Sequence, residues 1–150
     1  MEKLLNFRPP RIALSLLIIS FALWHLSPYK TLLHIPYKLI GSVSVIGGFV
    51  IMMRAWYSFK KARTAVCHTG NASILITQGV YKMTRNPMYL GMLLMLAGGA
   101  FIMGDVPAFF APITFLIIID KLFIPDEEAR LSGAFGDAYA DYMKRTRRWI

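Results

Sequence analysis

The chain has 150 residues, of which 56% are hydrophobic and 17% charged, and its formal net charge is +9. A soluble domain of this size needs more polar side chains to cover its surface, so the composition predicts a single-domain integral membrane protein. The basic residues lie mostly between apolar segments, which favours anionic lipid headgroups over nucleic acid as their partner. The single cysteine, Cys67, excludes an intrachain disulfide and a cysteine-based metal site.

Four apolar segments predict four transmembrane helices, at residues 12–27, 38–59, 88–104 and 106–124. A helix that crosses the hydrocarbon core needs about 20 residues, within a range of about 17 to 25. The second and fourth segments reach this length alone, and the others reach it with their flanks. Basic residues before the first segment are also typical of a signal peptide, but "HLSPYK" offers no cleavage site, which favours an uncleaved anchor. The short turn "MGDVP" makes the third and fourth helices antiparallel neighbours.

The distribution of Lys and Arg predicts that both termini face the cytoplasm, as in a protein of a bacterial inner membrane. Only Lys30 and Lys38 would fall in the outer loops. Pro125 and the acidic residues after it are typical of a helix start. Residues 126–148 are therefore expected to form cytosolic helices, ending in an amphipathic helix whose terminal arginines and Trp149 lie on the headgroup layer.

Two charged residues and several small ones interrupt the apolar segments. Arg54 and Asp120 fall near the inner ends of their segments, where snorkelling or a mutual ion pair would explain them. Small residues permit close contact between membrane helices. The residues expected in such contacts are Gly41, Ser44, Gly47, Gly48, Gly98 and Gly99.

Polar chemistry gathers where the third segment begins and the fourth ends. In "TRNPMY" the Asn86-Pro87 step starts the third helix, whose first amide groups can hold an anion. Glu127 and Glu128 follow the fourth segment at the same predicted depth. The pattern predicts a cleft at the membrane surface with cationic, aromatic and carboxylate walls. Taken singly, each residue also has an ordinary reading as an interface anchor, a topology-setting charge or a helix start.

The order of "GVY", "RNPMY", "PDEEARL" and "FGDAYADYMKRTRRW" resembles the isoprenylcysteine carboxyl methyltransferase family. That family belongs to a wider group of membrane methyltransferases that includes bacterial phospholipid N-methyltransferases. The resemblance covers Leu75 to Trp149 and rests on several separated motifs. The family's Arg-His-Pro is Arg85-Asn86-Pro87 here, a form typical of its uncharacterised bacterial branch, and Asn cannot titrate.

The resemblance implies a cytosolic S-adenosylmethionine site that the C-terminal helix closes, and a role for each residue that matches a motif. Cofactor-binding roles fall on one set of residues: Tyr81, Arg85, Asn86, Tyr89, Glu127, Tyr139 and Tyr142. Glu128 would face the reaction centre, and Arg145 would hold the acceptor carboxylate. No metal is implied. Methyl transfer is an in-line displacement, so the protein mainly has to align donor and acceptor.

The acceptor and the class of function stay open at this stage. The favoured function is methyl transfer to a lipid or another hydrophobic small molecule, with a carboxylate as one candidate acceptor. A phospholipid headgroup N-methyltransferase, in which Arg145 would contact phosphate, is an alternative, as is the nicotinamide-dependent sterol-reductase fold. A small transporter or assembly subunit is the non-catalytic alternative, although transporters usually place polar residues at mid-membrane. The sequence leaves the oligomeric state undetermined.

Overall fold

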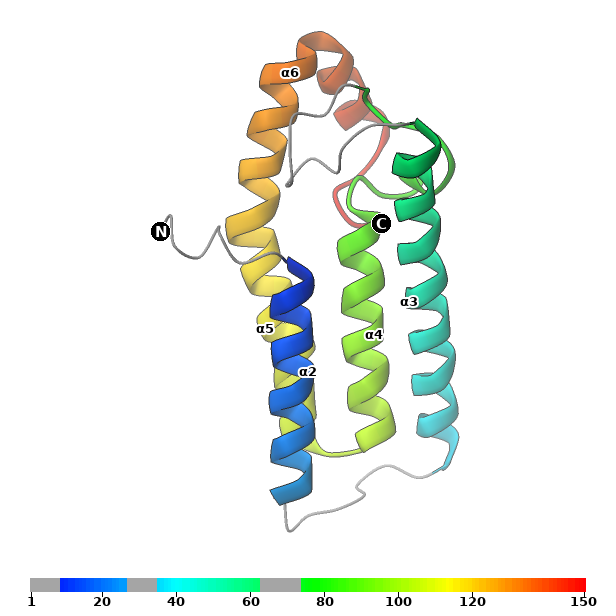
Figure 1. Ribbon diagram of the computed structural model, residues 1–150, viewed down its shortest axis with the longest axis vertical. Helices are drawn as coiled ribbons and strands as arrows, with labels where there is room; N and C mark the ends of the chain where they lie inside the picture. The colour runs from blue at the N-terminus through cyan, green and yellow to red at the C-terminus, as the bar shows by residue number, and fades with distance from the viewer. Residues whose placement is uncertain (1–8, 27–34, 63–73) are drawn as a thin grey trace.

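Figure 1 shows the computed structural model of the protein, in which residues 9–26, 35–62 and 74–150 are described. Three segments come first: α2 at Pro9–Leu26, α3 at Ile35–Ala62 and the 3₁₀ helix η2 at Gly79–Lys82. The remaining elements are α4 at Pro87–Met103, the 3₁₀ helix η3 at Val106–Phe109, α5 at Phe110–Ile118, the π-helix η4 at Ile119–Phe123 and α6 at Ile124–Arg145. Lys30 and Cys67, which entered the sequence analysis, lie outside the described residues.

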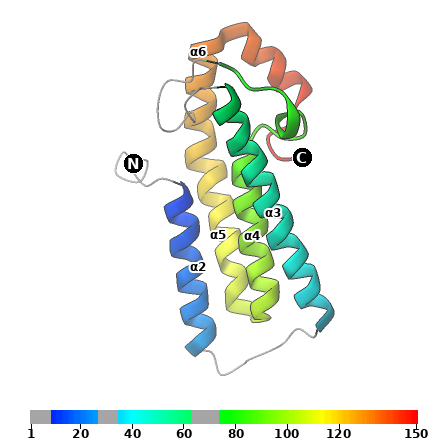
Figure 2. The ribbon, with the colours of Figure 1, turned by 45° about the vertical axis from the view of Figure 1, so that its right-hand side comes forward.

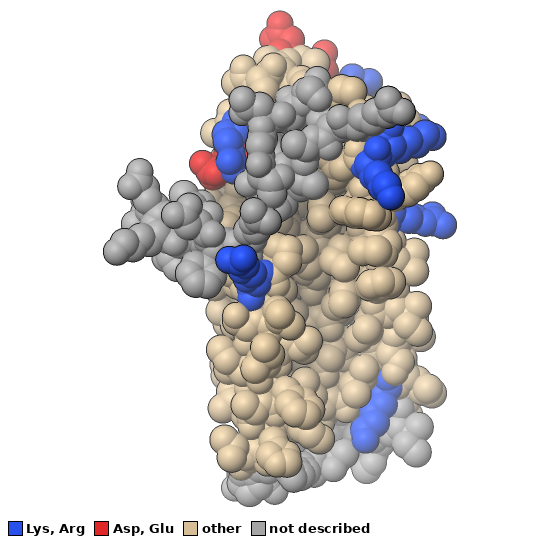
Figure 3. All heavy atoms as spheres, in the orientation of Figure 1, with Lys and Arg blue, Asp and Glu red and all other residues tan. Residues whose placement is uncertain are grey.

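The protein is an all-α integral membrane protein, as predicted. By length and composition, α2, α3 and the helix that begins at Val106 can each cross a membrane, and α4 is a shorter apolar helix. Large hydrophobic side chains on α2 and α3, such as Ile18, Phe21 and Val43, are more than half exposed because they face the lipid. In Figure 3 most of the visible face below the α6 end is uncharged, and Lys and Arg gather toward the end that bears α6, with single basic residues at mid-height and near the opposite end.

The apolar helices stand roughly side by side, with α4 between α3 on one side and α2 and α5 on the other (Figures 1 and 2). The buried core follows from this central position, since α4 contributes Tyr89, Met92 and Leu96, and α5 contributes Phe115. The polar end of the molecule lies where α3 ends and α4 begins, and the bent end of α6 covers it (Figure 2).

Glycine pairs bring α3 and α4 into backbone contact. A Cβ atom on Gly48 would lie 2.5 Å from the carbonyl oxygen of Gly91, and one on Gly98 would lie 2.5 Å from that of Gly41. Between these pairs the hydroxyl of Ser44 donates a hydrogen bond of 2.9 Å to the carbonyl of Leu94. The prediction of close packing is thus confirmed for part of the expected set, although Gly91 was not foreseen.

The other predicted glycines differ from these pairs. A Cβ atom on Gly47 would meet nothing within 4 Å, and one on Gly99 would make an ordinary contact of 3.6 Å with Leu17. Gly47 therefore lies beside the contact without taking part in it.

Pro125 lies in the first turn of α6, which begins at Ile124, but the helical path does not break there. The chain stays helical from α5 through η4 into α6, and the amide of Ile124 donates to the carbonyl of Ile119, five residues back. Proline supplies no N–H and its ring crowds the preceding turn. The wider π turn just before Pro125 changes the pairing of the backbone there, so that the helix passes the proline and carries Glu127 and Glu128 beyond the apolar part of the bundle.

Gly136 reverses the direction of the chain inside α6. Its backbone has φ of 49° and ψ of −124°, a conformation that side-chain-bearing residues rarely adopt. Figure 1 shows the result: the last part of α6 folds back over the end of the bundle, and the C-terminus comes to lie near the start of α4.

A Gly136→Ala variant is expected to lose about 1–3 kcal/mol of unfolding free energy, the usual cost of such a backbone conformation. The cost is conformational, because a Cβ atom at this position would meet nothing within 4 Å. Thermal unfolding of the detergent-solubilised protein, followed by circular dichroism, measures it. Gly133→Ala is the matched control, since Gly133 also has open space but keeps helical geometry, and alanine favours a helix there. Equal unfolding temperatures for the two variants would contradict the role of Gly136.

Candidate functional site

The reversal at Gly136 brings two tyrosines of α6 over the start of α4. Tyr139 is 1% exposed and Tyr142 7% exposed, and their ring centroids lie 6.1 Å apart. The hydroxyl of Tyr142 donates a hydrogen bond of 2.6 Å to the backbone carbonyl of Tyr81 in η2. Burial raises the pKa of the Tyr81 phenol, which therefore stays neutral across the physiological range. These contacts hold Tyr139 and Tyr142 in place over the start of α4, next to Tyr81.

The two adjacent glutamates of α6 have different partners. The Tyr89 hydroxyl donates a hydrogen bond of 2.9 Å to Glu127 Oε2. Glu128 forms two ion pairs, of 2.7 Å with Arg85 and 2.7 Å with Arg148, and Arg148 adds a second hydrogen bond of 3.2 Å through Nε. Among the described residues no ion pair involves Glu127. The site therefore holds one carboxylate that pairs with two guanidinium groups, and one that accepts a hydrogen bond from a phenol and forms no described ion pair.

Arg148 reaches this cluster from the chain that follows α6. It also pairs with Asp120 of η4 at 3.3 Å, and the indole of Trp149 donates to the same Asp120 oxygen at 3.1 Å. The hydrogen bonds to Glu128 raise the pKa of the Arg148 guanidinium, which keeps its charge. Asp120 thus pairs with Arg148, and the predicted alternative of a mutual pair with Arg54 is wrong. Arg54 is exposed.

Backbone carbonyls of the C-terminal tail, residues 146–150, bind the segment that precedes α4. The Thr84 hydroxyl and the Asn86 amide each donate a hydrogen bond of 3.0 Å to the carbonyl of Arg148. The backbone amide of Arg85 donates to the carbonyl of Arg147 at 3.0 Å. Asn86, which is the N-cap residue of α4, therefore uses its side chain to hold the tail and makes no side-chain hydrogen bond to its own helix.

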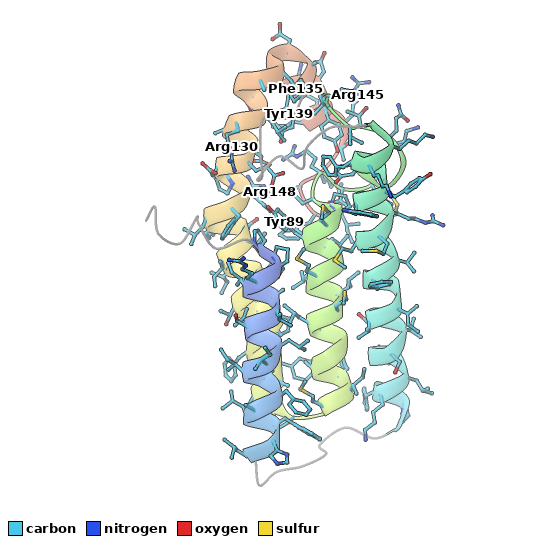
Figure 4. The ribbon with its side chains drawn as sticks, viewed as in Figure 1. Tyr89, Arg130, Phe135, Tyr139, Arg145 and Arg148 are labelled. Atoms are coloured by element: carbon cyan, nitrogen blue, oxygen red, sulfur yellow. The ribbon has the colours of Figure 1, made fainter. Side chains whose placement is uncertain are left out.

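A cavity of about 50 Å³ lies at the centre of these groups. It is lined by eight of the nine residues that the sequence singled out, namely Tyr81, Arg85, Asn86, Tyr89, Glu127, Glu128, Tyr139 and Tyr142. Figure 4 shows Tyr89 and Arg148 near the start of α4, with Tyr139 above them under the bent end of α6. Distant parts of the chain thus meet at one end of the bundle.

Arg145 is the one predicted site residue that lies elsewhere. It lines a neighbouring groove of about 730 Å³ together with Lys82, Thr77 and Gln78, and its Nε donates to the carbonyl of Asp141 in its own helix. Tyr142 separates this groove from the cavity and lines both. Arg145 therefore faces a different space from Arg85 and Arg148.

Sequence reasoning missed the roles of Arg148, Trp149 and Asp120. The terminal arginines and Trp149 were expected on the headgroup layer, but Arg148 and Trp149 turn inward, while Arg147 is exposed. The sequence offers little indication of which arginine turns inward, because three arginines lie within four residues. Only the path of the tail after Thr146 shows that Arg148 is the one that reaches Glu128.

The chemistry of the cavity fits a sulfonium donor such as S-adenosylmethionine. Carboxylates stabilise its positive groups, and aromatic faces add cation–π attraction. Arg85 Nε is buried and has no hydrogen-bond partner among the described residues, so it can bind a carboxylate. The cavity is much smaller than the roughly 300–1,000 Å³ of typical ligand pockets, so the walls must separate to admit such a molecule. Within the described residues no three His, Cys, Asp or Glu side chains group so as to hold a metal ion.

Comparisons with known proteins identify the family of the chain. A family model described as phospholipid methyltransferase matches residues 36–138. An uncharacterized protein of Haemophilus influenzae is 36% identical over 63 residues, which cover 42% of this chain and all of that protein. A protein-S-isoprenylcysteine O-methyltransferase of Schizosaccharomyces pombe is 33% identical over 75 residues, which cover 48% of this chain and 30% of that protein. No solved structure matches the chain.

Proposed function

The chain belongs to the phospholipid methyltransferase family of integral membrane methyltransferases, and we propose that it transfers a methyl group from S-adenosylmethionine to a lipid or another hydrophobic small molecule. The observation that carries the proposal is the meeting of α4 and α6 in one cavity that combines carboxylates, guanidinium groups and aromatic rings. We place the reaction at the cytosolic face of a bacterial inner membrane, with both termini cytoplasmic, because Lys and Arg gather at this end (Figure 3).

In this proposal Glu127 binds the positive part of the donor, since the Tyr89 phenol leaves its charge uncompensated. Arg85 and Asn86 hold the carboxylate of the donor, for which Arg85 Nε is available. Tyr81, Tyr139 and Tyr142 enclose the donor and exclude water. Glu128 lies beside the reaction centre, where its two arginine partners fix its orientation. S-adenosylmethionine supplies the electrophilic methyl group, and the chain aligns the acceptor with it.

An apolar groove supports a hydrophobic acceptor. It has a volume of about 320 Å³ and lies between α2, α3 and α4, where Leu14, Leu17, Val45 and Met95 line it. Met92 lines both this groove and the cavity of the site. An acceptor whose hydrocarbon tail lies in the groove would therefore extend its reactive end toward Glu128 from within the membrane.

Incubation of the detergent-solubilised protein with methyl-labelled S-adenosylmethionine and a total bacterial lipid extract tests the proposal. A labelled lipid that depends on the protein is the expected result, and its identification distinguishes a carboxylate from an amine acceptor. The family description names phospholipid as the acceptor, and the Schizosaccharomyces pombe relative is named for O-methylation. Binding of reduced nicotinamide cofactor, without binding of S-adenosylhomocysteine, would instead support the reductase alternative.

Arg145→Ala is expected to weaken the apparent affinity for an anionic acceptor by about tenfold, while donor affinity is unchanged. Arg145 would reach an acceptor phosphate or carboxylate from the groove beside Tyr142, away from the donor. Michaelis constants for the lipid identified above and for the donor measure the two effects. Lys144→Ala is the matched control, because Lys144 is exposed and pairs with Asp141. An equal loss for donor and acceptor would show that Arg145 does not hold the acceptor.

A further inference from the structure

Among the described residues, the charged ones that line the cavity are Arg85, Glu127 and Glu128, which together carry a net charge of minus one when both glutamates are ionised. Arg148 and Asp120 lie outside this lining, next to Glu128, and pair with each other. Lys121 also pairs with Asp120, at 3.8 Å, but its side chain is 76% exposed, so water screens its charge. Glu127 belongs to none of the described ion pairs.

This balance depends on a residue in the π turn of the fourth membrane helix. A π turn is rare and is frequently associated with function. Here it contains Asp120, which accepts hydrogen bonds from the Arg148 guanidinium and the Trp149 indole. Asp120 therefore holds the Arg148 guanidinium in place beside Glu128. Arg148 is only partly exposed, at 35% of its side chain, and Glu128 at 18%, so water screens their interaction with a ligand incompletely.

The donor and the product of methyl transfer differ in charge by one unit. S-adenosylmethionine carries a sulfonium, an ammonium and a carboxylate, and its net charge is plus one. In the reaction the carbon–sulfur bond breaks, its electron pair stays on sulfur, and an acceptor lone pair forms the new bond to carbon. The product, S-adenosylhomocysteine, is a neutral thioether with no net charge. A pocket of net charge minus one favours the donor over the product electrostatically.

We propose that Arg148 and Asp120 are specificity-determining residues whose charges, next to Glu128, set the electrostatic potential in the pocket, and with it the preference for the cationic donor over the neutral product. The inference rests on the proposed function, because it takes S-adenosylmethionine as the donor. Without Arg148 the surroundings of the pocket would carry one more negative charge, which would stabilise the cationic donor more than the neutral product. With Asp120 neutralised, the surroundings of the pocket would carry one less.

Calorimetric titration of the full chain with two ligands tests the proposal. One ligand is sinefungin, in which an amine replaces the sulfonium, so that it is cationic and transfers no methyl group. The other is S-adenosylhomocysteine. Arg148→Gln is expected to raise the ratio of sinefungin affinity to S-adenosylhomocysteine affinity by about tenfold, as expected for one unit charge near a partly buried ligand. Asp120→Asn is expected to lower the same ratio by about tenfold.

Three further variants separate charge from structure. Arg147→Gln removes the same charge from an exposed neighbour that forms no described ion pair, and the ratio should stay at the wild-type value. Arg148→Lys should restore the ratio, because it restores the charge. The double variant Asp120→Asn, Arg148→Gln should return the ratio to the wild-type value even if the fold is weakened, since the two changes cancel.

Each outcome decides between the proposals. Equal losses for both ligands in Arg148→Gln and Asp120→Asn would show a merely structural role and overturn the inference, while the proposed donor would stand. Failure of the wild-type chain to bind either ligand would overturn the proposed donor and the inference together. A shift of the ratio in the same direction for both single variants would contradict the charge argument.

Discussion

Replacing Glu127 with Gln is expected to weaken binding of S-adenosylmethionine by about 100-fold, a typical cost of removing one partner from a partly buried charge pair. The amide can still accept the hydrogen bond from Tyr89, so the shape of the cavity is kept and only the charge is lost. Calorimetric titration of the purified variant measures the effect. Glu128→Gln is expected to abolish turnover, because Arg85 and Arg148 lose the carboxylate that orients them.

Asp126→Asn is the matched control for both glutamate variants. Asp126 is the preceding residue of α6, its side chain is 43% exposed, and it pairs with Arg130 four residues on, outside the cavity. Its replacement should leave donor binding within twofold of the wild type, since exposed pairs of this kind contribute only about 0.3–0.5 kcal/mol. Wild-type activity in both Glu127→Gln and Glu128→Gln would remove the roles proposed for these residues.

The second large effect is expected from Gly48→Ala, which should lower the unfolding free energy by about 1–3 kcal/mol or separate α3 from α4. The new Cβ atom would lie 2.5 Å from the carbonyl oxygen of Gly91, and a backbone atom cannot turn aside as a side chain can. Gly47→Ala is the matched control, because the same atom would meet nothing within 4 Å there. Unfolding of both variants in the same detergent measures the difference, and equal stabilities would contradict close packing at Gly48.

The architecture follows from the sequence because it depends on local signals. Apolar length alone predicts the four helices, and the ends of the first three lie within a few residues of the predicted ones, whereas the fourth continues into α6. The continuous helical path through Pro125 was not foreseen for a physical reason: proline usually marks a helix start or end, and the π turn before it is not encoded by any simple spacing. Gly91 was missed for a related reason, since only the register of α3 against α4 shows which glycines oppose each other.

The site follows from the sequence in part. The resemblance to a family selected residues that the structure brings around one cavity, including Asn86 and Tyr139, which are far apart in the chain. It could not select among the terminal arginines. Arg145 lies on the helix and Arg148 on the tail beyond Thr146, where the backbone becomes extended, so the two side chains face different spaces. Such a difference arises from tertiary structure and leaves no mark on residue type or spacing.

The glycine contacts between α3 and α4 also restrict how the protein moves. Two helices whose backbones touch at both Gly41–Gly98 and Gly48–Gly91 have no side chains between them to rearrange, so they behave as one rigid body. Widening of the 50 Å³ cavity must then come from displacement of α6 or of the segment at residues 74–82, which line it opposite the two helices. The same contacts close the seam between α3 and α4 to lipid, so an acceptor that came from the bilayer would enter on the side of α2, where the apolar groove lies.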